Sequence, residues 1–231
     1  MSDFFRYPHT PHLAWLGRQA PRDDKVLSSH EALRLLKGEV IVEEKLDGAN
    51  IGISCHENGG LKAQNRGQYL DLPSKGQFSR LHDWMYAHTN DILKVLSPNL
   101  ILFGEWCSAR HSITYDKLPD WFLLFDVYDR SACKFWSVNR RNALGNAASL
   151  KIVPTLFTGT ASIESLTSLI EGAPSLFGPS EREGVVVRRD VGDWNEARAK
   201  LVSSEFTQSL TEHWRNRHLQ WNRLSLAASQ N

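Results

Sequence analysis

The sequence is poor in the features that mark secreted, membrane-spanning or disordered proteins. Its 231 residues include three cysteines, Cys55, Cys107 and Cys133, whose wide separation suits neither a disulfide framework nor a zinc site. No apolar run approaches the length of a membrane span, and Pro8 and Pro11 interrupt the N-terminal stretch that a signal peptide would need. These absences predict a protein of the reducing cytoplasm without a membrane partner.

The chain also lacks an excess of charge of either sign. Its formal net charge is +1, so a nucleic-acid partner would have to be bound by a local basic patch. Hydrophobic residues make up 41% of the chain and include eight tryptophans, enough for a substantial core. The length suits one large domain, or one domain with a small appendage.

Hydrophobic spacing predicts a mixture of helices and strands. Ser28 and Glu31 form a capping box for a helix that ends near Gly38, and the next residues predict a strand that ends at Lys45. Residues 49–67 predict a hairpin that returns Arg66 toward Lys45. Further helices are expected within 78–96, 140–150 and 162–172, and further strands within 99–106, 121–129, 183–189 and 197–202.

The C-terminal stretch, residues 204–224, has the spacing of a helix with an apolar and a basic face. The basic face either binds a nucleic-acid backbone or is simply solvated. We therefore expect one domain over residues 1–203, with an N-terminal lead-in and helix at 1–38, and a helical tail over 204–231. The apolar face would hold Phe206, Leu210, Trp214, Trp221 and Leu224, and the basic face Arg215, Arg217 and Arg223.

Several charged residues stand in apolar surroundings. Each has an ordinary explanation when taken alone: Lys45 as a solvated turn lysine, Glu105 as a strand-end carboxylate, or Lys200 as a charge on an edge strand. Burying unpaired charges is costly, so a set of them on neighbouring strands predicts that they converge on each other or on a charged ligand. The set is Lys45, Asp47, Arg66, Glu105, Asp126, Glu183 and Lys200.

These residues stand in motifs that resemble those of the covalent nucleotidyltransferases, the family of ATP-dependent RNA and DNA ligases and mRNA capping enzymes. Lys45-Leu46-Asp47-Gly48 is similar to the family's nucleophile motif, Lys-x-Asp-Gly. Residues 104–129 and 198–206 most resemble RNA ligases of the RNA ligase 2 type. The other motifs follow in family order: Arg66 in NRG, Glu105 in LFGEW, Phe125 and Asp126 in FLLFDVYD, Glu183 in EGVVVR and Lys200 in RAKLV.

The resemblance implies a fold and an activity. The fold is an α+β, ATP-grasp-like adenylation domain of antiparallel sheets flanked by helices. The activity is joining of RNA 5′-phosphate and 3′-hydroxyl ends with ATP and Mg²⁺ or Mn²⁺, through lysyl-AMP and adenylylated RNA. Too few residues follow the last motif for the oligonucleotide-binding barrel of DNA ligases and capping enzymes. Whether the ends meet in a nicked duplex, and whether an accessory RNA-binding partner helps, stays open.

The resemblance also assigns catalytic roles. Lys45 is the nucleophile and must lose its proton, which the cations Lys200, Arg198 and magnesium would favour. Lys200 contacts the α-phosphate. Arg198 replaces the first lysine of the usual Lys-x-Lys, so it suits a phosphate clamp better than a proton shuttle. The catalytic set is Lys45, Lys200, Glu183 and Arg198.

Nucleotide and metal contacts are implied in the same way. Glu105, Glu183 and Asp126 would hold the metal ion, with ribose binding as an alternative for Glu105. Phe125 either stacks on adenine or packs in the core, and Glu44 would accept a hydrogen bond from the adenine amino group. Arg66 would hold ribose or a phosphate, and Asp47 would also contact the nucleotide. The expected nucleotide-binding set is Glu44, Lys45, Asp47, Arg66, Glu105, Phe125, Glu183 and Lys200.

Two weaker features and two rival functions complete the expectations. His9 and His12 suggest a metal pair, but the proline between them favours a loop contact. Residues Arg110–Tyr115 form either a substrate-facing loop or a structural turn. One rival is a DNA ligase or a capping-type enzyme of the same superfamily. The other is a non-catalytic nucleotide- or RNA-binding module. Loss of Lys45 or Glu183 would have favoured this module, but both residues are present.

Overall fold

Two sheets form the centre of the molecule. The computed structural model describes residues 4–17, 25–55, 59–209 and 218–226. The first sheet is antiparallel, in the order β10-β9-β1-β8. Its strands are β1 (Val40–Lys45), β8 (Thr155–Gly159), β9 (Gly184–Val191) and β10 (Trp194–Val202).

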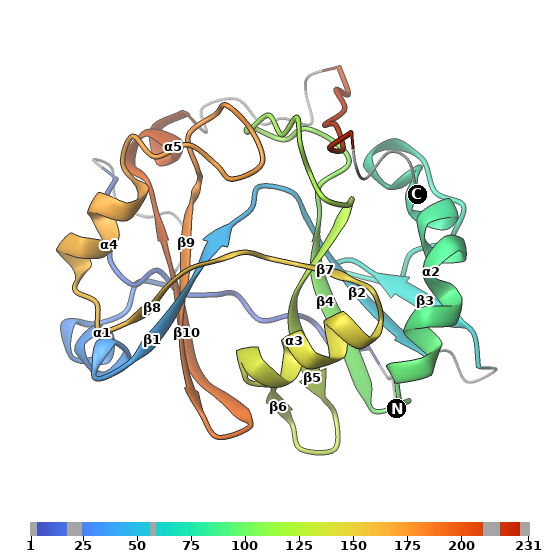
Figure 1. Cartoon of the computed structure of the whole chain (residues 1–231), viewed down its shortest axis with the longest axis horizontal. Coiled ribbons are helices and arrows are strands. Elements are labelled where there is room, and N and C mark those ends of the chain that lie inside the picture. The colour runs from blue at the N-terminus through green and yellow to red at the C-terminus, as the bar shows by residue number, and fades with distance from the viewer. Residues whose placement is uncertain (1–3, 18–24, 56–58, 210–217, 227–231) are drawn as a thin grey trace.

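The second sheet stands beside the first, and the chain passes from one to the other directly after Lys45 (Figure 1). Its order is β3-β2-β4-β5-β6, and all of these neighbours are antiparallel. A further strand, β7 (Lys151–Ile152), pairs in parallel with β5. The other strands are β2 (Ala49–Cys55), β3 (Leu61–Gln64), β4 (Leu100–Trp106), β5 (Phe122–Asp129) and β6 (Lys134–Phe135).

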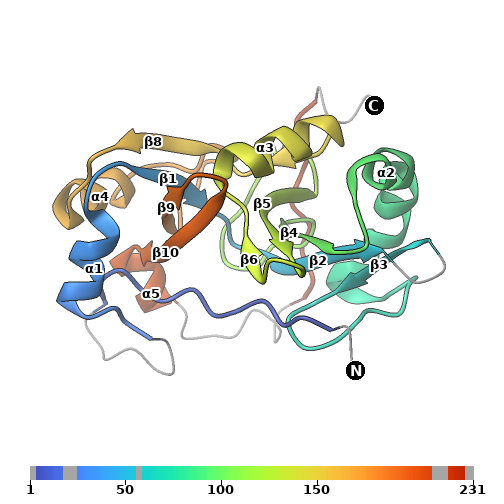
Figure 2. The ribbon, with the colours of Figure 1, turned by 90° about the horizontal axis from the view of Figure 1, so that it is seen from below.

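Helices cover the sheets and bury their apolar faces. The amphipathic helices α1 (Ser29–Leu36) and α4 (Ile163–Ile170) pack on the first sheet, where apolar side chains of β1, β9 and β10 form one core cluster. The longer α2 (Leu81–Val95) and α3 (Val138–Ala147) pack on the second sheet around another cluster. Figure 2 shows the N-terminal segment running beneath both sheets. A 3₁₀ turn, Gly76–Phe78, precedes α2, and α5 (Ser204–Ser209) follows β10.

The predicted α+β architecture is confirmed, including the capping box from Ser28 to Glu31 and the hairpin of β2 and β3. The three cysteines are free thiols. Among the described residues, no helix is long and apolar enough to cross a membrane. The short strand β7 adds one parallel pairing to the predicted antiparallel sheets.

The expected C-terminal helix over 204–224 is wrong in its last part. Helix α5 covers only Ser204–Ser209, and residues 210–217, with Leu210, Trp214, Arg215 and Arg217, lie outside the described residues. Residues 218–226 carry no helix, because their backbone pairs instead with the loop of residues 107–118. Trp221, Arg223 and Leu224 therefore do not share helix faces with Phe206.

A buried network of charges joins the two sheets. Glu43 of β1 accepts hydrogen bonds from Arg141 of α3 at 2.6 Å and from Arg188 of β9 at 3.4 Å. Arg188 also pairs with Asp126 of β5, which accepts a second hydrogen bond from the Tyr7 hydroxyl at 2.5 Å. All five side chains are almost wholly buried. Opposite charges thus offset one another where the sheets meet.

We predict that Arg141→Met lowers the free energy of unfolding by about 3–5 kcal/mol, because it leaves buried carboxylate charge without its closest partner. Urea denaturation monitored by tryptophan fluorescence would measure the change. Lys94→Ala is the control, since Lys94 pairs with Asp91 on the exposed surface of α2. Equal, small effects of the two substitutions would contradict the structural role of the network.

Candidate active site

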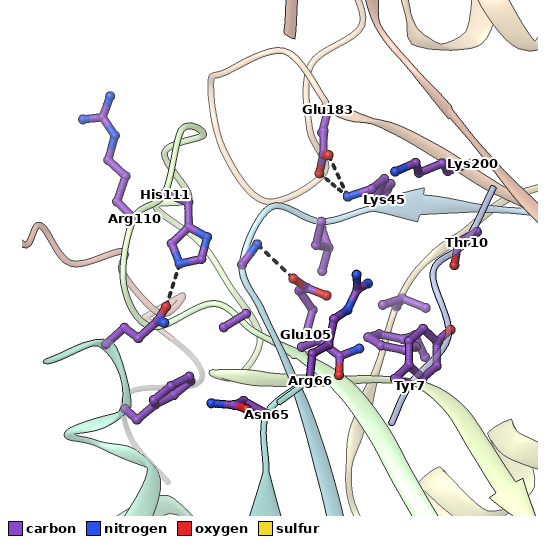
Figure 3. A pocket seen from close by; sticks show the side chains of 18 of the residues that line it. Tyr7, Thr10, Lys45, Asn65, Arg66, Glu105, Arg110, His111, Glu183 and Lys200 are labelled. Carbon is purple, nitrogen blue, oxygen red and sulfur yellow. Dashed lines mark hydrogen bonds and ion pairs between the residues drawn. The ribbon is translucent and has the colours of Figure 1, made fainter. Parts of the chain in front are cut away.

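A cavity of about 1360 Å³ lies between the sheets and collects most of the predicted residues. Lys45 enters it from the end of β1, Glu105 from β4, and Lys200 from β10 (Figure 3). Arg66 enters from the segment after β3, and Glu183 from the residue before β9. The hairpin prediction that brought Arg66 toward Lys45 is confirmed.

Lys45 and Glu183 form the centre of the cavity. The Lys45 Nζ atom lies 2.6 Å from one carboxylate oxygen of Glu183 and 2.7 Å from the other. Strand register produces this pair, because Lys45 lies opposite Gly184 on β9. On the other side of β9, Lys200 lies opposite Val186. Adjacent strands therefore bring two lysines and a carboxylate to one place.

Negative charge dominates around Lys45. Glu105 accepts a hydrogen bond from the backbone N–H of Gly48 at 3.1 Å. Burial raises the pKa of both Glu105 and Glu183 to about 7, against the opposing attraction of Lys45. Burial alone would lower the pKa of Lys45, but the charges of Glu183 and Glu105 outweigh it, so the pKa is raised. The lysine is therefore protonated at neutral pH.

The turn that carries Lys45 is fixed by the loop of residues 107–118. One oxygen of Asp47 accepts hydrogen bonds from the N–H groups of Ser112 at 2.7 Å and Ile113 at 2.9 Å. The N–H of Asp47 donates to the Tyr115 hydroxyl at 2.8 Å. A Cβ on Gly48 would lie 2.6 Å from the carbonyl oxygen of Trp106, so only glycine fits there.

Comparison with known proteins agrees with this geometry. A family profile described as RNA ligase matches residues 38–202. This range contains β1 to β10, the strands of both sheets. The chain belongs to the RNA ligase family. No curated protein matches the chain.

Solved structures of an RNA ligase from Naegleria gruberi share the fold of this RNA ligase family member. An apo mutant has a TM-score of 0.62 at 17% identity, over 94% of this chain and 60% of that one. The form with PPi has a TM-score of 0.60 at 22% identity, over 80% and 54%. A mutant with ATP and Mn has a TM-score of 0.58 at 19% identity, over 92% and 64%. This chain thus spans about three fifths of the length of those ligases.

Three predicted nucleotide or catalytic contacts need correction. Asp47 does not line the cavity, because its carboxylate is turned to the backbone of the 107–118 loop. Glu44 borders the cavity, but the Ser175 hydroxyl and the Leu176 N–H donate to its two oxygens, so it fastens a loop rather than meeting adenine. Arg198 lies 3.6 Å from Asp126 and over the ring of Phe135, and it does not line the cavity.

The predicted metal ligand Asp126 also needs correction. It is fully buried outside the cavity lining, and Arg188 and the Tyr7 hydroxyl take up its oxygens. Burial opposes its ionisation, but Arg188 and Arg198 outweigh burial and lower its pKa. Its negative charge therefore balances arginines, and it is not available to a metal ion.

Glu105 and Glu183 remain suitable for a metal ion. In the described ranges, no group of three or more His, Cys, Asp or Glu side chains has the arrangement of a metal centre. Two carboxylates suit Mg²⁺, which proteins commonly hold with one or two carboxylates together with waters and substrate phosphates. His9 contacts the guanidinium of Arg66 at 3.3 Å, in agreement with the loop contact that its sequence favoured.

Other parts of the cavity wall were missed in the sequence. The N-terminal lead-in contributes Tyr7, His9 and Thr10, because its backbone pairs with Lys200 on β10. Arg188, the 3₁₀ turn and residues 218–220 also line the cavity. No motif marks these segments; only pairing between distant parts of the chain brings them together. Phe125 lines the cavity beside Tyr7, with their ring centroids 5.4 Å apart.

We predict that Glu183→Gln lowers the pKa of Lys45, because it removes the closest negative charge and keeps the size of the side chain. Without ATP, an amine-acylating reagent should then modify Lys45 several-fold faster at pH 8, as measured by peptide mass spectrometry. The decisive measurement is the pH at which labelling of Lys45 is half-maximal, which should be lower in Glu183→Gln than in the native protein. Glu171→Gln on the exposed surface is the control, and an unchanged midpoint in Glu183→Gln would disprove the pairing.

Proposed function

We propose that this protein is an ATP-dependent RNA ligase that seals 5′-phosphate and 3′-hydroxyl ends through a covalent lysyl-AMP. The observation that carries the proposal is the Lys45 amine, held by Glu183 in a cavity that Lys200 and Glu105 also line. Solved structures of the N. gruberi RNA ligase with ATP and Mn, and with PPi, support ATP and a divalent metal ion here.

In the first step, the Lys45 nitrogen attacks the α-phosphorus of ATP. The N–P bond forms, the bond to the bridging oxygen breaks, and pyrophosphate leaves with the electron pair. Glu183 is placed to accept the lysine proton, because its carboxylate touches the ammonium. Lys200 stabilises the charge on the phosphate oxygens.

Mg²⁺ or Mn²⁺ at Glu105 and Glu183 would supply positive charge that offsets both carboxylates and the phosphates. The sequence predicted that Lys200, Arg198 and magnesium favour the neutral Lys45 amine, whereas Glu183 and Glu105 act in the opposite direction. In the ligand-free protein, the carboxylates keep Lys45 charged. Phe125 is retained as the adenine-stacking residue, and Arg66 as a contact to ribose or phosphate, since both line the cavity.

The next two steps move AMP and then release it. An oxygen of the RNA 5′-phosphate attacks the phosphorus of lysyl-AMP, the P–N bond breaks, and the Lys45 nitrogen takes up a proton. The 3′-hydroxyl oxygen then attacks the activated 5′-phosphorus, loses its proton, and displaces AMP. Each transfer depends on cations that stabilise the phosphoryl charge, which is the role proposed for Lys200.

The remaining assignments are also proposals. Residues 1–203 are taken as the adenylation domain and 204–231 as an appendage, which packs back on the domain through residues 218–226. The three free thiols support a reducing, cytoplasmic location. An accessory RNA-binding partner would supply further contacts to the RNA.

We expect the native protein to become radiolabelled when incubated with ATP labelled at the α-phosphate and Mg²⁺ or Mn²⁺. The bond to AMP requires the lysine nitrogen, so Lys45→Ala should carry background label only, measured after denaturing electrophoresis. Lys94→Ala on the exposed surface of α2 should label normally. No label on the native protein, or equal label on Lys45→Ala, would favour the non-catalytic binding module.

The polynucleotide should be RNA and the nucleotide ATP. Matched nicked duplexes with RNA or DNA at the nick, each tested with ATP and with GTP, should show sealing of the RNA nick with ATP. Gel separation of substrate, adenylylated strand and product gives the rate of each step. Rapid sealing of DNA alone, or nucleotide transfer only with GTP, would instead support the DNA ligase or the capping-type enzyme.

A further inference from the structure

The cavity extends from Lys45 to a mouth made by three separate chain segments, residues 75–77, 110–111 and 218–220. We call these segments the mouth. Figure 3 shows Arg110 and His111 on the opposite side of the cavity from Lys45 and Lys200. A cavity of about 1360 Å³ exceeds the roughly 300–1000 Å³ usual for one small ligand, so there is room for a second substrate.

Hydrogen bonds join the mouth into one surface. His111 Nε2 lies 2.8 Å from Oε1 of Gln77. The guanidinium of Arg110 donates to the side-chain oxygen of Gln220 at 3.0 Å, and its backbone N–H donates to the Gln220 carbonyl at 2.8 Å. The indole N–H of Trp106 donates to the Gln77 carbonyl at 2.8 Å. The three segments therefore keep a fixed relation to one another and to β4.

The C-terminal side of the mouth is held by Asn222. This side chain is 3% exposed, donates to the carbonyls of Cys107 at 2.8 Å and Ala109 at 3.3 Å, and accepts from the Tyr115 N–H at 2.9 Å. The guanidinium of Arg80 lies over the ring of Trp221, the residue before Asn222, at 4.3 Å from the ring centroid. Residues 218–220 thus reach the mouth because the segment behind them is locked to the 107–118 loop.

The charge of the mouth differs from that of the Lys45 end. Residues 75–77, 110–111 and 218–220 include Lys75, Arg110 and two histidines but no acidic residue. The Lys45 end contains Glu105 and Glu183, which suit a metal-bound nucleotide. Cations with amide and imidazole groups suit the phosphodiester backbone of a nucleic acid.

We propose that the mouth binds the backbone of the RNA strand whose 5′-phosphate receives AMP from Lys45. This inference rests on the proposed function and names the surface that presents its second substrate. Arg110 supplies the central phosphate contact, because the Gln220 side chain and the backbone pairing hold it at the cavity wall. Lys75, which is exposed, contacts a neighbouring phosphate.

The test separates lysyl-AMP formation from transfer to RNA. Protein labelled with α-labelled ATP is freed of nucleotide and mixed with increasing concentrations of a 5′-phosphorylated RNA 12-mer. Arg110→Ala should raise the RNA concentration for half-maximal transfer by about tenfold, as expected for loss of one charge-assisted contact. Lys75→Ala should act in the same direction, and Arg110→Lys should recover part of the loss. Arg130→Ala, away from the cavity, is the matched control.

Salt dependence and direct binding give independent readouts. Fluorescence anisotropy of the same 12-mer, measured on unlabelled protein, should show weaker binding to Arg110→Ala. The slope of log affinity against log salt concentration should become shallower by about one for each lost phosphate contact. Thermal unfolding of each variant shows whether it is folded. Because binding needs no chemistry, this readout tests the mouth even if the native protein forms no lysyl-AMP.

Three outcomes would overturn the inference. Unchanged transfer and unchanged RNA binding in Arg110→Ala and Lys75→Ala would exclude the mouth as the RNA site. A loss confined to lysyl-AMP formation would show that the mouth holds the ATP phosphates instead. Equal weakening by Arg130→Ala would indicate a general charge effect. Absence of label on the native protein, with RNA binding still dependent on Arg110, would reject the ligase function and leave the RNA site standing.

Discussion

The pairing of Glu43 and Asp126 with Arg141 and Arg188 is the interaction on which the site depends. These four charges come from both sheets and from α3, and two of them, Glu43 and Arg188, also line the cavity. Arg141 and Arg188 also donate to the Phe125 carbonyl, at 2.7 and 3.2 Å. The same network that neutralises buried charge therefore fixes the strand that presents Phe125 to the cavity. Residues of a site between two sheets keep their relative positions only if the sheets are fixed to each other.

The turn after Lys45 illustrates how a motif can combine chemistry with geometry. Its lysine points into the cavity, whereas its aspartate points away and holds the 107–118 loop. Its glycine allows the turn to approach the β4 backbone. A pattern of four residues thus describes one proposed nucleophile and two constraints on its position. The aspartate therefore acts on Lys45 by holding the loop beside it and by its negative charge, which helps to raise the pKa of Lys45.

The sequence predicts the parts of this structure that depend on local pattern and on order along the chain. Capping at Ser28, the hairpin after Gly48 and the convergence of Lys45, Glu105 and Glu183 follow from periodicity and motif spacing. Hydrogen-bond partners are not visible in that pattern. Glu44 and Asp126 lie where the sequence predicted carboxylates. Their oxygens are nevertheless bound by residues distant in sequence, Glu44 by Ser175 and Asp126 by Arg188. The extended segment at 218–226 was missed because its helical spacing is outweighed by backbone pairing with the 107–118 loop.

The involvement of residues 218–226 has a consequence for biosynthesis. The loop of residues 107–118, which braces the Lys45 turn, receives hydrogen bonds from a segment that the ribosome makes about a hundred residues later. Domains generally fold as units during synthesis. Both sheets are complete once β10 has emerged, but the braces of the loop are not. The loop that fixes the Lys45 turn is therefore complete only when residues 218–226 have also been made.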